Sequence, residues 1–316
     1  MIITKAPVRV PIGGGGTDLP EFYTQYGEGR LSAVTINRFV YCLVRENFEC
    51  GIRFTGYHNK ETVRHSSEIK NPLVRNVLEV LGIDDGIEIV SMSDIRSSCG
   101  LGTSSAFTVA LISAIYNYYG IKYNSISLAE QARYIERERL AEAGGFQDQY
   151  ASSIGGGVIL KCTREGVVSA EKMVISDTEW KRFFKKLVFF DTSISRRSFE
   201  IQSNTVSKIK NNSETINYLS RILAIGKEIE DNLIRGSYDE VGILIHEHWE
   251  YKKKYTDNKD LKINKIIEES RKYGSVGGKL MGAGGGGFIM CYSKNEKNKK
   301  TLIEYMMKQG FTIANF

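Results

Sequence analysis

The sequence predicts an α+β protein built from two domains, and three observations support this prediction. The 316 residues correspond to two domains at the usual size of about 150 residues each. Hydrophobic residues make up 41% and charged residues 25% of the chain, which is typical of a globular protein with a substantial core. Short β-rich segments fill the first part of the sequence, whereas residues 198–273 are helical and charged in composition. A shift in composition near residue 165 predicts domains at 1–165 and 166–316.

The N-terminal half alternates predicted strands with two helices. From Ser104 the side chains are apolar all round, as in a buried helix, and Gly120 stands where a C-cap is expected. Ser127 and Glu130 form the pattern of a capping box, which predicts a second helix running to about Ala141. Strands are predicted at 2–4, 39–44, 88–90 and 155–160.

The C-terminal half is predicted to be mainly helical, with strands at its start and end. Strands are expected at 165–175 and 187–191, before the helical stretch 198–273. A glycine loop at 282–287 then leads into a strand at 288–292, and a short helix and strand close the chain.

Composition and charge exclude several classes of protein. No run of 18 apolar residues is present, so no membrane span is predicted, and the N-terminus lacks the long apolar run of a secretory signal. We therefore expect a cytoplasmic protein, whose five cysteines form no CxxC pair and stay reduced. The net charge of +6 is spread along the chain without a basic stripe interleaved with aromatic residues. It favours an acidic small-molecule substrate over nucleic acid.

The glycine-rich segments do not match the commonest phosphate-binding patterns. The P-loop pattern is absent, as are the HRD and DFG signatures of protein kinases. Residues 282–287 satisfy GxGxxG literally but lead into a strand rather than a helix. They are therefore not interpreted as a dinucleotide-binding fingerprint.

A second glycine loop, residues 97–106, runs directly into the predicted buried helix. Free N–H groups at a helix start, with the helix dipole behind them, form an anion site that needs no lysine. The candidate residues of this anion site are Ser98, Gly100, Leu101, Gly102, Thr103, Ser104 and Ser105. An ordinary serine-rich N-cap is the alternative interpretation, and the residues alone leave both open.

Two carboxylates flank a Gly-Gly break further along the chain. Glu136 lies on a predicted helix, and Asp148 follows the break at Gly144 and Gly145. One carboxylate could hold a metal while the other faces a substrate hydroxyl. Charges on a helix are more often solvated surface, so this pair alone is weak evidence.

Taken together, these motifs resemble the GHMP kinases, the family of galacto-, homoserine, mevalonate and phosphomevalonate kinases. The resemblance rests on three motifs in order, at 6–18, 97–106 and 279–287, together with the acid pair, and it spans nearly the whole chain. It implies a two-domain fold with a ribosomal-protein-like βαβ domain, a C-terminal α/β domain and an active site in the cleft between them. It also implies that ATP and Mg²⁺ are the cofactors.

Several roles follow from the resemblance, position by position. Ser104 and Glu136 would hold Mg²⁺. Asp148 matches the catalytic aspartate, and Arg9 matches the basic residue that stabilises this aspartate and the transferring phosphate. The predicted substrate contacts are Gly15, Gly16, Thr17, Asp18, Gly284 and Gly285.

The expected acceptor is a sugar phosphate. Galactokinases have Glu-His before the Thr-Asp pair, but here Gly15 and Gly16 stand there, which argues against galactose. The GGGGTDLP form is most similar to the branch that phosphorylates D-glycero-D-manno-heptose 7-phosphate at its anomeric oxygen, in bacterial nucleotide-heptose synthesis. Arg196 and Arg197 are the predicted contacts of the acceptor phosphate. A solvated basic turn is the alternative for this pair.

Other interpretations remain beside this one. The alternatives are another anomeric sugar kinase similar to fucokinases, a catalytically silent sugar sensor, and an RNA-binding protein, which is the weakest. The oligomeric state stays open, with a homodimer as one option. His246 and His248 are interpreted as structural, because i, i+2 spacing puts their rings on different faces of a helix.

Overall fold

The computed structural model describes residues 1–57, 59–194, 198–256 and 261–316. The chain forms two compact units that interleave in the sequence. Unit 1 comprises 1–9, 35–97 and 102–155, and unit 2 comprises 10–34, 98–101 and 156–316. The division at 165 made from composition stays a prediction about folding domains.

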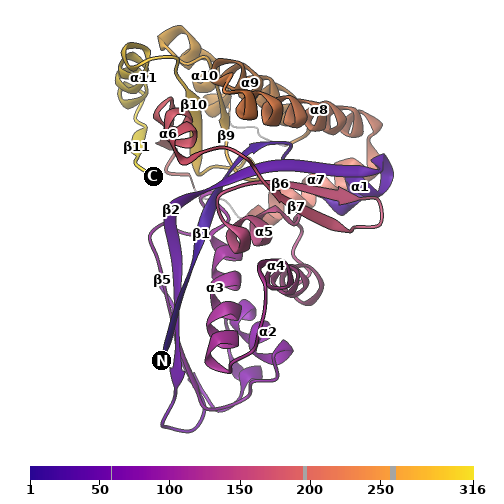
Figure 1. The fold of residues 1–316 in the computed structure, drawn as a ribbon, viewed down its shortest axis with the longest axis vertical. Helices are drawn as coiled ribbons and strands as arrows, with labels where there is room; N and C mark the ends of the chain where they lie inside the picture. Colours follow the sequence, from indigo (N-terminus) through magenta and orange to yellow (C-terminus); the bar gives the residue numbers. More distant parts are fainter. Residues whose placement is uncertain (58, 195–197, 257–260) are drawn as a thin grey trace. The chain divides into compact units, whose positions relative to one another are not determined.

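Unit 1 is a layer of strands covered by helices (Figure 1). Its strands belong to a seven-stranded sheet of order β4-β3-β5-β2-β6-β7, with β1 also paired to β2, in which β3 runs parallel to β5 and the strands β6 and β7 belong to unit 2. The strands are β1 (Ile2–Gly13), β2 (Glu28–Glu46), β3 (Ile52–Thr55), β4 (Lys60–Val63) and β5 (Ile87–Ser93), of which β1 and β2 continue into unit 2. The helical elements are η1 (Ser66–Glu68), α2 (Pro72–Val80), α3 (Thr103–Tyr118), α4 (Ser125–Tyr134), η2 (Ile135–Arg139) and α5 (Gln147–Ile154).

Helix α3 is the centre of unit 1. Its apolar residues are buried on all sides, as the sequence predicted, and Gly120 follows its end with a φ of 70°. The next helix, α4, begins at Ser125, two residues before the predicted capping residue. Asn124 caps it, because its side chain accepts from the N–H of Ser127 at 2.9 Å while Ser127 Oγ accepts from the N–H of Asn124. The predicted box at Ser127 and Glu130 is therefore wrong.

A single π-helical turn, η2, continues α4 and carries Glu136. Such turns widen the backbone and are frequent at functional sites. The α-helix expected to reach Ala141 therefore ends at Tyr134.

Unit 2 contains a second, antiparallel sheet of order β11-β8-β10-β9. Helix α9 packs along α8 and also against β9. The strands are β6 (Gly157–Thr163), β7 (Val168–Lys172), β8 (Leu187–Asp191), β9 (Gly277–Leu280), β10 (Phe288–Tyr292) and β11 (Thr312–Ala314). The helices are α1 (Pro20–Tyr26), α6 (Asp177–Lys185), α7 (Ser198–Asn211), α8 (Ser213–Arg235), α9 (Tyr238–Tyr255), α10 (Leu261–Ser270), η3 (Arg271–Tyr273) and α11 (Glu296–Lys308).

The core of unit 2 holds its glycine loop in place. Phe190 of β8, Leu280 of β9 and Ile289 of β10 are fully buried in one cluster with Trp249 of α9. Ile289 lies opposite both Phe190 and Leu280 in the sheet register. The loop 281–287 between β9 and β10 is thus anchored at both ends by a buried hairpin.

The model contains no helix, in the part of the chain that it describes, with the length and apolar character needed to cross a membrane. All five cysteines are free thiols, and Cys50 is the exposed one.

Candidate active site

Unit 1 brings together Arg9 and Asp148, two residues that are 139 positions apart in the sequence. Arg9 Nε donates to Asp148 Oδ1 at 2.8 Å, and Nη2 of the same guanidinium lies 2.6 Å from that oxygen. The Arg9 side chain is only 4% exposed, whereas that of Asp148 is 25% exposed. The pair therefore combines a buried cation with a carboxylate that solvent and a substrate can reach.

The second oxygen of Asp148 lies at the start of helix α3. Gly102 is the N-cap of this helix and has a φ of 73°. A Cβ atom at Gly102 would lie 3.2 Å from Asp148 Oδ2. Glycine is needed here both for the left-handed backbone and for the close approach of the carboxylate. The base predicted from the sequence is thus adjacent to the helix start predicted to bind phosphate.

Glu136 is a buried carboxylate surrounded by neutral donors. Its residue is 4% exposed. Oε2 accepts from Ser105 Oγ at 2.7 Å and from Gln149 Nε2, and Oε1 accepts from Thr108 Oγ1 at 2.5 Å. Burial raises the pKa of Glu136 to about 7, and the three hydrogen bonds lower the pKa only in part. Glu142 is the nearby charge, and it raises the pKa further.

These surroundings fit a cation at Glu136. Among the described residues, the side chains that hydrogen-bond to this carboxylate or shift its pKa include no positively charged group. Burying a carboxylate without a counter-ion is costly, and a divalent cation with oxygen ligands would remove that cost. Ser104, the other predicted ligand, is exposed, while Ser105 points to Glu136. The role of Ser104 at the metal stays a prediction.

Residues 98–101, the part of the predicted phosphate loop that belongs to unit 2, pack against the third glycine motif of the same unit. A Cβ at Gly282 would lie 2.5 Å from the Cα of Gly100, and one at Gly287 would collide with the carbonyl of Cys99. Both glycines have positive φ. Cys99 is 1% exposed. These glycines of the third motif therefore act by letting the loop 98–101 approach their backbone.

Thr17 and Asp18, the predicted substrate contacts of the first motif, are buried. The Thr17 hydroxyl donates towards the carbonyls of Gly14 and Arg30, at 2.8 and 2.7 Å, and accepts from the N–H of Arg30. Asp18 Oδ1 accepts from the N–H of Gly16 at 3.1 Å. Both side chains thus hold the loop closed in unit 2, and their contact with a sugar stays a prediction.

The remaining predicted contacts differ in how open their surroundings are. Gly15 has nothing within 4 Å of its Cβ position, whereas a Cβ at Gly16 would lie 2.7 Å from the hydroxyl of Tyr255. Gly284 is buried against Lys252. Gly285 is half-buried. Arg196 and Arg197 lie outside the described residues.

The sequence analysis missed several residues that build these surroundings. Thr108 and Gln149 contact Glu136. Gly226 of α8 lets that helix approach Gly14, and Lys252 of α9 donates to the carbonyl of Gly282. Gln149 directly follows the predicted base. Gly226 interrupts an apolar helical face. These were the signals available in the sequence.

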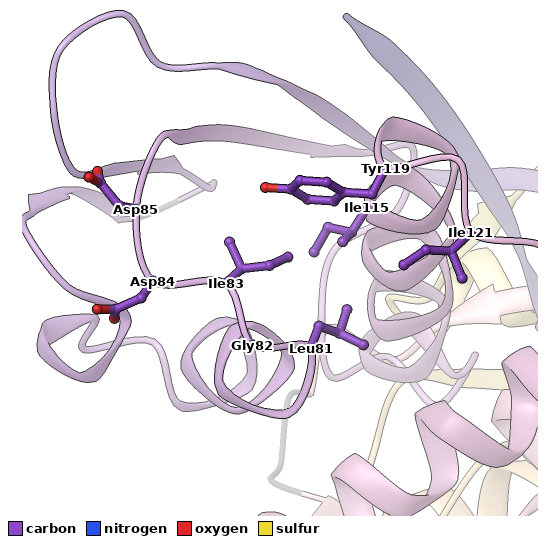
Figure 2. A pocket seen from close by; sticks show the side chains of 8 residues that line it. All are labelled: Leu81, Gly82, Ile83, Asp84, Asp85, Ile115, Tyr119 and Ile121. Carbon is purple, nitrogen blue, oxygen red and sulfur yellow. The ribbon is translucent and has the colours of Figure 1, made fainter.

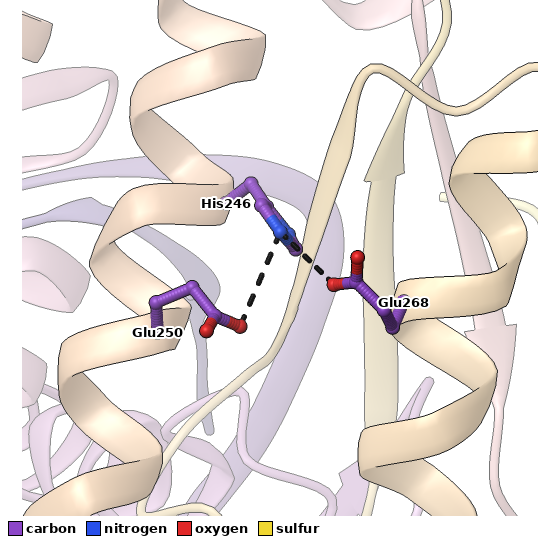
Figure 3. A group of neighbouring side chains, drawn as sticks. All are labelled: His246, Glu250 and Glu268. Atoms are coloured by element: carbon purple, nitrogen blue, oxygen red, sulfur yellow. Dashed lines mark ion pairs between the residues drawn. The ribbon is translucent and has the colours of Figure 1, made fainter.

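A cluster of His246, Glu250 and Glu268 joins α9 to α10, but its charges are already balanced (Figure 3). His246 Nε2 lies 3.3 Å from Glu268 and 4.0 Å from Glu250. Arg271 lies 3.2 Å from the same ring nitrogen, and Lys253 is paired with Glu250. Burial and Arg271 lower the pKa of His246. The cluster is an ion-pair network between two helices.

A cavity of about 370 Å³ in unit 1 is lined by apolar side chains together with Asp84 and Asp85 (Figure 2). Ile83, Ile115 and Tyr119 point towards one another, while the carboxylates of Asp84 and Asp85 point away from them. Asp84 is bonded to His65 and Ser66. This cavity shares no residue with the site around Asp148. Its lining residues are Leu81, Gly82, Ile83, Asp84, Asp85, Ile115, Tyr119 and Ile121.

Comparison with known proteins gives matches along the whole chain. Residues 69–156 match the model "GHMP kinases N terminal domain", and residues 229–312 match "GHMP kinases C terminal". A D-glycero-alpha-D-manno-heptose 7-phosphate kinase of Campylobacter jejuni is 25% identical, over 100% of this chain and 96% of the relative. An L-fucokinase/L-fucose-1-P guanylyltransferase of Bacteroides fragilis is also 25% identical, over 92% of this chain but only 34% of the relative.

Solved structures show the same fold. A crystal structure of a D-glycero-D-manno-heptose 1-phosphate kinase from Bacteroides thetaiotaomicron has a TM-score of 0.81 at 21% identity, covering 99% of this chain and 95% of that one. A mevalonate kinase of Methanococcus jannaschii has a TM-score of 0.73 at 21% identity, covering 99% and 96%. The predicted two-domain fold with mixed α and β content is thereby confirmed.

Proposed function

The chain belongs to the GHMP kinase family, and from this premise we propose that it transfers a phosphate from ATP to the anomeric hydroxyl of D-glycero-D-manno-heptose 7-phosphate. The product would be the 1,7-bisphosphate. The observation that carries the proposal is the Arg9–Asp148 pair, whose accessible carboxylate lies against Gly102 at the start of α3.

Asp148 is suited to act as the general base. Oδ1 is held by Arg9, which leaves Oδ2 to accept the proton of the acceptor hydroxyl. Arg9 orients the carboxylate through two contacts to Oδ1, and its fixed charge would also stabilise the transferring phosphate. Phosphoryl transfer depends mainly on positioning and charge neutralisation, and this pair supplies both.

The start of α3 is suited to hold the phosphates of ATP. The first N–H groups of an α-helix point out of its N-terminal end, and the helix dipole favours an anion there. Glu136 would be a ligand of Mg²⁺, which would neutralise the charge of the phosphates. The predicted phosphate contacts would line this end of the nucleotide, with Gly100 fixed by its approach to Gly282. They are Ser98, Gly100, Leu101, Gly102, Thr103, Ser104 and Ser105.

The acceptor is inferred from the relatives and from the first motif. The heptose 7-phosphate kinase of Campylobacter jejuni matches over 96% of its length, and Gly15 and Gly16 replace the Glu-His pair of galactokinases. The second candidate, a kinase for an unphosphorylated sugar such as fucose, is supported by the relative from Bacteroides fragilis. A catalytically silent sensor is disfavoured, because Arg9, Glu136 and Asp148 are all present and the pair is formed.

The experiment compares acceptors directly. The protein is incubated with ATP and Mg²⁺ and with D-glycero-D-manno-heptose 7-phosphate, the unphosphorylated heptose, fucose or galactose, and ADP release and the ³¹P spectrum of the product are recorded. The proposal predicts an anomeric phosphate formed only from the heptose 7-phosphate. An equal kcat/KM for the unphosphorylated heptose would contradict the hypothesis that the acceptor is a sugar phosphate. Turnover of fucose alone would favour the second candidate.

The proposed reaction also implies a metabolic role for its product. A heptose 1,7-bisphosphate would enter the synthesis of a nucleotide-activated heptose for cell-surface polysaccharide in the cytoplasm.

A further inference from the structure

Two neighbouring residues of the short helix α5 face different parts of the proposed machinery. Asp148 contacts Arg9 and lies against Gly102, whereas Gln149 Nε2 donates to Glu136 Oε2 and to Ser105 Oγ, the latter at 3.2 Å. Consecutive residues on a helix point about 100° apart. A single turn of α5 therefore fixes the position of the base relative to the buried carboxylate.

Helix α5 is itself firmly anchored. Phe146 and Tyr150 are each 1% exposed, and their rings meet edge to face at 6.1 Å. This packing sets the rotation of the helix, so Asp148 and Gln149 have little freedom to exchange places.

The contacts of Gln149 are not explained by core packing alone. Gln149 is 3% exposed, and its Oε1 atom is buried without a hydrogen-bond partner. An apolar side chain of similar length, such as methionine, would avoid this penalty. What glutamine adds is the amide N–H group directed at Glu136.

Thr108 supplies the matching contact on the other oxygen. It lies on α3, is fully buried and donates to Glu136 Oε1. Valine has nearly the same shape but no hydroxyl, so the packing role of Thr108 can be separated from its donor role. Together with Ser105, these donors engage both oxygens of the carboxylate.

We propose that Thr108 and Gln149 are positioning residues that orient Glu136 for a divalent cation, and that Gln149 ties this ligand to the base Asp148. The inference rests on the proposed function and extends it to two residues for which the sequence analysis predicted no role. Residues that hydrogen-bond a metal ligand fix its orientation, and their loss typically weakens metal binding 10- to 100-fold.

The test measures metal binding without turnover. Binding of Mn²⁺ in the presence of ADP is followed by the electron paramagnetic resonance signal of free Mn²⁺, for the wild type and for Thr108→Val and Gln149→Met. Both variants are expected to raise the Kd of Mn²⁺ about 10- to 100-fold while leaving the Kd of metal-free ADP unchanged. Thr108→Ser keeps the hydroxyl and is expected to restore wild-type Mn²⁺ binding.

Ser152→Ala is the matched control. Ser152 lies on the same helix, is buried, and has a hydroxyl without a hydrogen-bond partner. Its loss should leave Mn²⁺ binding unchanged, and thermal unfolding of each variant checks the fold. If Thr108→Val does not fold, Thr108→Ala takes its place in the same measurement.

A wild-type Kd for Mn²⁺ in both Thr108→Val and Gln149→Met would overturn the inference. Glu136→Gln distinguishes this failure from failure of the proposed metal role. If Glu136→Gln loses Mn²⁺ while the two other variants keep it, only the positioning roles are wrong. If Glu136→Gln also binds Mn²⁺ normally, Glu136 is not the ligand.

Discussion

At the scale of single residues, the polar groups of the candidate site differ in how they are compensated. Arg9 is buried but paired with Asp148, whereas Glu136 is buried among neutral donors. Removing one partner of a buried ion pair typically destabilises the folded protein by about 3–5 kcal/mol, because the other charge stays buried without compensation. A buried carboxylate that has no cation beside it, such as that of Glu136, instead favours the binding of a cation. The two sites thus have different physical tasks, which is consistent with separate roles in proton acceptance and metal binding.

His248 gives a prediction about pH. It is 2% exposed, both ring nitrogens lack hydrogen-bond partners, and burial, Lys279 and Lys252 lower its pKa well below 6.5. As the pH is lowered, His248 therefore takes up a proton at a higher pH in the unfolded chain than in the folded protein. The free energy of unfolding should accordingly fall as the pH drops below about 6.5. The expected slope approaches 1.4 kcal/mol per pH unit for one proton. Urea unfolding between pH 5 and 7.5 measures it.

The comparison is with His248→Phe, which has a similar shape and no titrating group. This variant should lose the acid-dependent part of the slope, while other groups such as His246 continue to contribute. The same slope in both proteins would show that His248 is not held neutral.

At the scale of elements, the glycine motifs act mainly through close backbone contacts. Gly282 has a φ of 66°, and a Cβ there would meet the Cα of Gly100 at 2.5 Å. We predict that Gly282→Ala lowers the free energy of unfolding by about 2–4 kcal/mol, because strain at positive φ and a backbone collision both contribute. It should also weaken ATP binding, since Gly100 belongs to the predicted phosphate loop. Chemical denaturation and calorimetry measure the two effects.

Gly15→Ala is the control for this prediction. Gly15 has open space at its Cβ position, so the substitution should change the free energy of unfolding by no more than about 0.5 kcal/mol. If Gly282→Ala is as stable as Gly15→Ala, the close packing of the two loops is not as described.

The sequence predicted some of these elements because their signals are local. The buried helix α3 and its end at Gly120 follow from a continuous apolar pattern and a C-cap glycine. Helix α1 was missed, because its N-cap Leu19 makes no side-chain cap bond. The capping box was placed at Ser127 although Asn124 forms it, since either residue type can cap a helix.

The residues of the candidate site could likewise be predicted from the sequence only where a local motif marks them. Asp148 and Glu136 were found from a resemblance in motifs. The donor roles of Thr108 and Gln149 were not predicted. A threonine inside an apolar helix carries no distinctive pattern, and Gln149 was noted only as the last residue of the segment 145–149, which resembles the GxxDQ pattern of galactokinases. Their role depends on tertiary contacts spanning 28 and 13 residues, which no local pattern reports.

At the scale of the whole molecule, nucleotide and metal should stabilise the protein together. A ligand that binds only the folded state adds about 2.7 kcal/mol at 100 times its Kd. We predict that ADP with Mg²⁺ raises Tm by several degrees more than ADP alone, and that Glu136→Gln removes this difference. Differential scanning calorimetry measures both. An equal Tm increase with and without Mg²⁺ in the wild type would contradict the proposed metal site.

The most direct test of the central claim is the turnover of Asp148→Asn. The amide keeps the shape and an acceptor for Arg9, but it cannot take the proton of the acceptor hydroxyl. We predict that kcat falls at least about 100-fold while the Kd for ADP stays within about twofold, and that Asp231→Asn, at an exposed position of α8, has wild-type activity. An Asp148→Asn protein that folds and retains more than about a tenth of the wild-type kcat would contradict the assignment of Asp148 as the base.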